Sequence, residues 1–174
     1  MGNYLWGSAE KGSDDTAKAV HTASVLNGNE DAHEIQDGLF LGNLGAAESS
    51  AWRTANGISH ILSVLPHELS PVPSNIKRLQ LKVRDSHASL IAGLFGESIQ
   101  FIDEALKSGG RVLVHCWKGV SRSATIVIAY VMRSQRLQYE AAFALVQARR
   151  ACVEPNPGFQ TQLVCITIFY VRSR

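Results

Sequence analysis

Apolar and polar positions follow one another along the chain in patterns that predict strands and helices in turn. Apolar residues at every second position from 79 to 83 predict a half-buried strand, and the short apolar runs 58–65 and 111–114 predict buried strands. Helical spacing of apolar residues predicts a helix over 95–106, while 123–132 is apolar on almost every side and predicts a buried helix. Strands that alternate with helices indicate a single α/β domain.

Turn-forming residues separate these elements. Asp37-Gly38 between apolar neighbours predicts a hairpin, and Asn56-Gly57 predicts the end of a short helix over 46–56. A further amphipathic helix is expected to begin at Tyr139, while the stretch from Phe159 onward suits a strand by its β-branched residues and a helix by its length. Together the elements predict a central, largely parallel, twisted sheet of about five strands flanked by helices.

The first residues differ in character from the rest of the chain. Residues 1–33 are polar and rich in small side chains, and they are expected to form a lead-in segment, helical or flexible, before a folded domain over 34–174. Met1-Gly2 opens like a myristoylation signal, but Trp6 stands where such signals have Ser or Thr, so no lipid anchor is expected. The apolar run 163–171 is too short to span a bilayer, so no membrane span is expected either.

Composition and charge exclude several classes of protein. Apolar residues make up 45% and charged residues 18% of the 174 residues, as in ordinary globular domains. A net charge of +2 is too small to favour binding to nucleic acid or to a membrane surface. Three cysteines, an odd number without zinc-type spacing, indicate a reducing compartment. We therefore expect an intracellular, cytoplasmic protein, with a nuclear location left open.

The loop between the strand 111–114 and the helix 123–132 carries the candidate chemistry. Five residues separate Cys116 from Arg122, so the loop can curl until its N–H groups converge on one centre, helped by a positive φ at Gly119. The helix that follows adds the positive end of its dipole, and Arg122 can close the ring with a planar fork onto two anion oxygens. A thiol in such surroundings loses its proton easily, which would make Cys116 a nucleophile aimed at a bound phosphate.

The residues of this loop resemble a known signature. His115-Cys116-x-x-Gly119-Val120-Ser121-Arg122-Ser123 resembles the motif of the cysteine-based protein phosphatases, in particular the small atypical dual-specificity branch. Further matching stretches at 37–43, 57–62 and 155–163 extend the resemblance over most of the chain. The resemblance implies a compact α/β phosphatase catalytic domain over 34–174, a phosphate-binding loop between strand and helix, a phosphocysteine intermediate, and neither metal nor cofactor.

The resemblance also implies a role for each residue of the motif. Cys116 would be the nucleophile, Arg122 the phosphate clamp, and Ser123 the hydroxyl that assists release from the thiolate. His115 would order the loop, and Asn156 would support it. The other loop residues would bind the substrate phosphate or line the rim of the pocket: Trp117, Lys118, Gly119, Val120 and Ser121. Trp117 and Lys118 stand where many relatives have small residues.

The reaction also needs an acid that protonates the leaving oxygen. Asp85 is the candidate, because it follows the predicted strand 79–83 and lies 31 residues before Cys116. Members of the family that the chain resembles have their acid on a loop at about that separation in sequence from the cysteine. Asp103 is the rival, but it sits beside Glu104 in a predicted helix, where a carboxylate is expected to face water.

The sequence therefore predicts a protein phosphatase in signalling that hydrolyses phosphotyrosine and phosphoserine or phosphothreonine. One alternative keeps this chemistry but acts on a phosphoinositide or an RNA 5′-phosphate, which a lysine-rich loop would favour; here Lys118 is the single lysine. A second alternative is a non-catalytic phosphate-binding module, which would lack Cys116 or Arg122, and both are present. Phosphorylated proteins are the expected partners, no nucleic acid is expected, and the oligomeric state stays open.

Overall fold

The structure of the chain, a computed structural model, describes residues 30–172 and the side chains of residues 30–166. The Met1-Gly2 signal and most of the predicted lead-in segment lie outside these residues. The first strand begins at Ala32, two residues before the predicted domain boundary at 34.

A five-stranded sheet forms the centre of the domain. Its spatial order is β1 (Ala32–Gln36), β2 (Leu39–Gly42), β5 (Val112–His115), β3 (His60–Val64) and β4 (Lys77–Leu81). β1 and β2 form the predicted hairpin, in which Gly38 has a φ of 74°, and the other neighbouring strands are all parallel. The predicted fold class, a single α/β domain around a largely parallel sheet, is confirmed.

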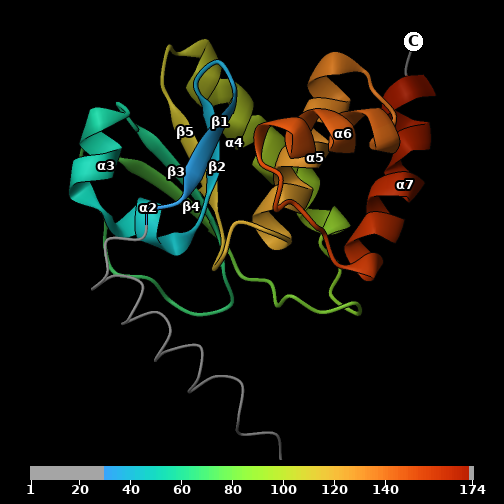
Figure 1. Cartoon of the computed structure of the whole chain (residues 1–174), viewed down its shortest axis with the longest axis horizontal. Coiled ribbons are helices and arrows are strands. Elements are labelled where there is room, and N and C mark those ends of the chain that lie inside the picture. The colour runs from blue at the N-terminus through green and yellow to red at the C-terminus, as the bar shows by residue number, and fades with distance from the viewer. Residues whose placement is uncertain (1–29, 173–174) are drawn as a thin grey trace, which may run out of the picture.

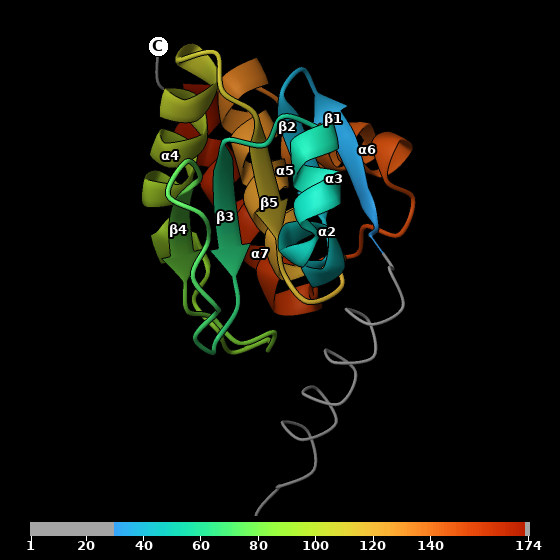
Figure 2. The ribbon, with the colours of Figure 1, turned by 90° about the vertical axis from the view of Figure 1, so that its left-hand side faces the viewer.

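Helices cover both faces of the sheet (Figures 1 and 2). The short helices α2 (Leu44–Glu48) and α3 (Ser50–Ala55) lie on one face. On the other face α5 (Arg122–Gln135) is surrounded by three helices: α4 (Phe95–Lys107), which a 3₁₀ turn η1 (Ala92–Leu94) precedes, α6 (Tyr139–Arg149) and α7 (Pro157–Arg172). The apolar core follows the same division, with one cluster of buried side chains on each face.

Burial on all sides explains the sequence of α5. Every residue from 122 to 132 is buried, because the sheet lies on one side of the helix and α4, α6 and α7 lie on the others. Each fully buried Val or Ile contributes about 1.5–3 kcal/mol relative to an exposed one. This helix therefore fixes the position of the loop from which it starts.

One element differs from the sequence prediction, and one that the sequence left ambiguous is resolved. The helix expected over 46–56 is two helices, because Ser49 ends α2 and its Oγ accepts from Trp52 N at 3.1 Å as the cap of α3. The ambiguous stretch from Phe159 is helical: Asn156 Oδ1 accepts from Phe159 N at 3.0 Å, and Pro157 takes the first helical position. Neither α7 nor another helix of the described residues is long and apolar enough to cross a membrane.

Candidate active site

Cys116 and Arg122 bound a loop between the centre of the sheet and the buried helix. Cys116 directly follows β5, and Arg122 is the first residue of α5. We call residues 116–121 the anion loop. It lies at the carboxyl ends of the parallel strands, at the same edge of the sheet as the β4–η1 loop, residues 82–91 (Figure 1). Binding sites in open α/β sheets form at this edge.

The backbone of the anion loop is held from outside. Its carbonyls at 117, 118, 119 and 120 all accept hydrogen bonds, from Leu44 N, from the Arg150 side chain twice, and from Glu154 N respectively. A peptide whose carbonyl points outward turns its N–H inward, so the amides of residues 118–121 converge on one centre. Gly119 has a φ of 71°, and a Cβ there would lie 2.5 Å from Gly42 O, so the curl requires glycine.

The sulfur of Cys116 lies at the base of this loop. The residue is 2% exposed, and Ser123 Oγ donates to its Sγ at 3.1 Å from the first turn of α5. A donor at this distance stabilises a thiolate, and it does the same for the sulfur when a group leaves it. The distance between Ser123 Oγ and Cys116 Sγ is therefore short enough for the predicted role of Ser123, which is to donate a hydrogen bond to the sulfur.

His115 supports the loop as a neutral side chain. It is 1% exposed, its Nε2 shares a hydrogen bond with Ser63 Oγ at 2.7 Å, and its Nδ1 lies 3.2 Å from Cys116 O. Burial lowers the pKa of His115 to about 4, so the imidazole is uncharged at neutral pH. It therefore holds β5, β3 and the start of the anion loop together without adding a charge.

Arg122 is a buried arginine at the end of the anion loop. Its side chain is buried, and its Nη1 makes one long contact, 3.5 Å to Val83 O. Its Nε lies 3.6 Å from Asp85 Oδ2, which is an ion pair but too long for a hydrogen bond, so this Nε has no hydrogen-bond partner among the described residues. Buried donors are nearly always paired in proteins, so this N–H is suited to an oxygen of a bound phosphate.

Asp85 is brought to the same place from a different part of the chain. Its Oδ1 accepts from Ser121 Oγ at 2.7 Å and from Asn156 Nδ2 at 2.8 Å. β4 ends at Leu81, so Asp85 lies on the β4–η1 loop and not at the strand end. The rival Asp103, on α4, instead accepts from Tyr130 OH at 3.2 Å and from Lys107 Nζ at 3.3 Å.

Helix α7 holds the β4–η1 loop in place. Gln162 donates from Nε2 to Ser89 O at 2.9 Å and accepts at Oε1 from Ala92 N at 2.9 Å. Gly158 packs so closely that a Cβ there would lie 2.1 Å from His87 O. No roles for Gly158 and Gln162 could be predicted from the sequence, although both fall within the stretch 155–163 that carries part of the resemblance.

Adding one methyl group should separate the β4–η1 loop from α7. Gly158→Ala is expected to displace the loop and slow turnover of substrates with poor leaving groups by about tenfold to a hundredfold, because Asp85 moves with it. Gly96→Ala on α4 is the matched control, since a Cβ there meets nothing within 4 Å. Steady-state rates on alkyl and aryl phosphates check this. Equal rates for Gly158→Ala and the wild type would contradict the role of this packing.

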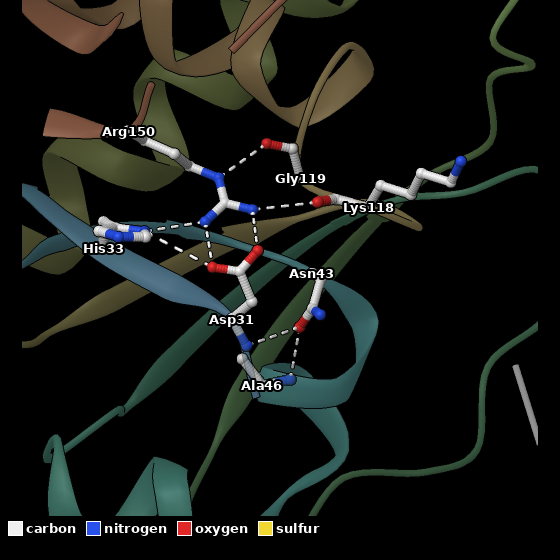
Figure 3. Close-up of polar contacts among 7 residues, drawn as sticks. All are labelled: Asp31, His33, Asn43, Ala46, Lys118, Gly119 and Arg150. Atoms are coloured by element: carbon white, nitrogen blue, oxygen red, sulfur yellow. Dashed lines mark hydrogen bonds and ion pairs between the residues drawn. The ribbon is translucent and has the colours of Figure 1, made fainter. Parts of the chain in front are cut away.

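Trp117 and Lys118 are the residues of the anion loop that are predicted to line the rim of the pocket. The Trp117 ring meets the His67 ring edge-on, with centroids 5.8 Å apart, and His67 belongs to the loop between β3 and β4. Lys118 is exposed, and its side chain extends away from Arg150 and Asp31 (Figure 3). Their predicted role in substrate binding stays a prediction, as does that of Val120, whose carbonyl faces Glu154 N.

Comparison with known proteins gives one consistent result. The family model described as the dual specificity phosphatase catalytic domain matches residues 39–167. Dual specificity protein phosphatase 1B of Arabidopsis thaliana is 38% identical over 144 residues, which cover 83% of this chain and 86% of that protein. Human dual specificity protein phosphatase 22 is 41% identical over 132 residues, covering 75% and 71%. The crystal structure of DUSP15 superimposes with a TM-score of 0.78 and 34% identity over 82% of this chain and 90% of that one.

Proposed function

The chain belongs to the dual specificity phosphatase family, in its small atypical form, and we propose that Cys116, Arg122, Asp85 and Ser123 carry its reaction. Members of this family are cysteine-dependent protein phosphatases, hydrolases that act on phosphotyrosine and on phosphoserine or phosphothreonine. Their mechanism passes through a phosphocysteine intermediate. The proposal concerns which atoms of this chain perform each step.

In the first step the phosphate would occupy the centre of the anion loop. The inward amides of residues 118–121 and the Nε of Arg122 bind its oxygens, and the thiolate of Cys116 attacks phosphorus. The bond between phosphorus and the leaving oxygen breaks, and that oxygen takes a proton from Asp85. Because both hydrogen bonds of Asp85 reach Oδ1, its Oδ2 is the oxygen that carries this proton.

In the second step water would attack the phosphocysteine. Asp85, now ionised, accepts a proton from the water, and the bond between phosphorus and Sγ breaks. Ser123 Oγ, 3.1 Å from Sγ, donates to the sulfur as its negative charge returns. Inorganic phosphate then leaves, and the thiolate and the protonated acid are restored.

One observation supports this assignment above the others. Three side chains from two separate parts of the chain converge on the anion loop: the Nε of Arg122, which has no hydrogen-bond partner among the described residues, and Ser123 against Sγ come from the first turn of α5, and the carboxylate of Asp85, 3.6 Å from that Nε, comes from the β4–η1 loop. A module that only bound phosphate would need the loop and the arginine. It would have no use for a carboxylate beside a bound anion, because like charges repel.

We propose phosphorylated proteins as the substrates, within a catalytic domain over 34–174 and an intracellular, cytoplasmic setting. The thiol chemistry supports that setting, because Cys116 must stay reduced to react, and Cys116, Cys152 and Cys165 are all free. A phosphoinositide or an RNA 5′-phosphate remains the second candidate substrate, since Lys118 is exposed on the rim where it could meet a highly charged ligand.

Hydrolysis of an aryl phosphate tests the proposed mechanism directly. Activity is expected to persist in EDTA, because the steps above use side chains, backbone amides and water, and to be lost in orthovanadate, which is expected to occupy the anion loop. Loss of activity in EDTA would instead indicate a metal-dependent hydrolase. A panel of a phosphotyrosine peptide, a phosphothreonine peptide, a phosphoinositide and a 5′-phosphorylated RNA then separates the two substrate classes.

A further inference from the structure

Arg150 is a fully buried arginine at the end of α6. It is 1% exposed, whereas its neighbour Arg149 is exposed. The sequence gives no sign of this difference, since both residues stand at a helix C-terminus, where cations are favoured. A guanidinium removed from water is tolerated only when its charge and its donors are paired.

Every N–H of this guanidinium has an acceptor (Figure 3). Nη1 and Nη2 donate to the two carboxylate oxygens of Asp31, each at 2.7 Å. Nη1 also donates to His33 Nδ1 at 2.8 Å, Nε donates to Gly119 O at 3.0 Å, and Nη2 donates to Lys118 O at 3.1 Å. Five donors in a rigid plane match this set, and the ammonium of a lysine could not reach it.

Arg150 is the side chain that fixes the orientation of two peptide groups of the anion loop. The other outward carbonyls, at Trp117 and Val120, accept from backbone amides. The carbonyls of Lys118 and Gly119 accept from Arg150, which turns the N–H groups of Gly119 and Val120 toward the phosphate centre. Half of the converging amides of the loop thus depend on one side chain outside it.

Asp31 fixes the other side of the guanidinium. Its backbone pairs with Asn43 at the ends of β1 and β2: Asn43 N donates to Asp31 O at 2.9 Å, and Asp31 N donates to Asn43 Oδ1 at 3.3 Å. The hydrogen bonds from Arg150 lower the pKa of Asp31, so the carboxylate is ionised at neutral pH. The carboxylate therefore holds the guanidinium at one angle to the anion loop.

We propose that Arg150 and Asp31 are positioning residues for phosphate binding, with Arg150 as the brace that holds two amides of the anion loop and Asp31 as its anchor. This inference rests on the proposed function of the loop. Neither residue touches the reacting atoms. Their contribution is the geometry of the amides, which act on the phosphate and on the thiolate of Cys116.

Charge alone offers a competing explanation with a different signature. Arg150 is a cation near Cys116, and the two groups attract. If only the charge mattered, Arg150→Lys would behave as the wild type. Asp31→Asn would then expose the Cys116 thiol to more positive charge and make it react as a thiolate at lower pH. If Arg150 and Asp31 act by positioning the amides, both variants should weaken phosphate binding by the anion loop and make the thiol react at higher pH.

Four variants of the full chain test the proposal, with the orthovanadate dissociation constant and the pH midpoint of Cys116 alkylation by iodoacetate as readouts. Arg150→Lys and Arg150→Gln are expected to weaken vanadate binding about tenfold or more, because two hydrogen bonds to the loop are lost. Asp31→Asn is expected to weaken it about threefold, and all three raise the alkylation midpoint. Arg149→Gln, which makes the same charge change one residue away on the exposed surface, should match the wild type.

Measurements well below each melting temperature separate positioning from stability. Variants that melt earlier but bind vanadate as the wild type does would overturn the proposal, as would a lower alkylation midpoint in Asp31→Asn. Should the Arg150 variants fail to fold, the sign of the Asp31→Asn shift decides alone. A wild-type protein whose Cys116 alkylation is not blocked by vanadate would instead refute the proposed function of the anion loop.

Discussion

Cys116→Ser is expected to abolish turnover, by about 10⁴-fold or more, while the protein keeps its affinity for oxyanions. A serine hydroxyl is a much weaker nucleophile than a thiolate, and it holds its proton at neutral pH. The amides of residues 118–121 and the Nε of Arg122, which bind the phosphate, are unchanged by the substitution. Steady-state hydrolysis of an aryl phosphate measures the loss, and calorimetry with orthovanadate measures the retained binding.

A second cysteine provides the control for this variant. Cys165 is exposed on α7, so Cys165→Ser should leave both rate and affinity unchanged. Measurable turnover by Cys116→Ser above the background of the preparation would refute the phosphocysteine mechanism. The inactive variant also serves to capture substrates, because phosphorylated proteins that bind it are not released as products.

Asp85→Asn is expected to slow substrates with poor leaving groups by about 10²–10³-fold and to remove the falling limb of the pH–rate profile. The amide is isosteric and keeps an oxygen for Ser121 and Asn156, so the loop stays in place while the transferable proton is lost. Aryl phosphates with good leaving groups need little protonation and should be slowed much less. Profiles of kcat/KM against pH for alkyl and aryl phosphates measure both effects.

The rival carboxylate serves as the matched control. Asp103→Asn makes the same change on α4, where the side chain contacts Tyr130 and Lys107. It is expected to leave the pH profile as in the wild type. A falling limb that survives unchanged in Asp85→Asn, or disappears in Asp103→Asn, would show that the acid has been assigned to the wrong residue.

The sheet and the anion loop could be predicted because their signals are local. A short apolar run, a cysteine, a glycine, an arginine and a buried helix follow one another within residues 111–132, so strand, loop and helix can be read together. The final helix was ambiguous because its β-branched residues favour strand. The local features that decide it are the Asn156 cap and Pro157 at the helix start, which outweigh that preference.

The support of the site could not be predicted, because it depends on contacts between distant parts of the chain. Asp31 and Arg150 are 119 residues apart, and Gln162 reaches Ser89 across 73 residues. Only one of two adjacent arginines turns inward, and the choice follows from where α6 ends relative to the anion loop. No periodicity in the sequence carries that information.

Arg150 lies 31 residues after Gly119, so a chain growing from its N-terminus contains the anion loop before it contains the arginine that braces it. A chain extended only to residue 140 already contains Cys116, Arg122 and Asp85, along with every strand of the sheet. It lacks Arg150, Asn156 and Gln162, so the anion loop has no brace from Arg150, and the β4–η1 loop lacks its contacts with Asn156 and Gln162. Because domains generally fold as units, we expect the nucleophile to gain its positioned loop only when α6 and α7 have also been synthesised.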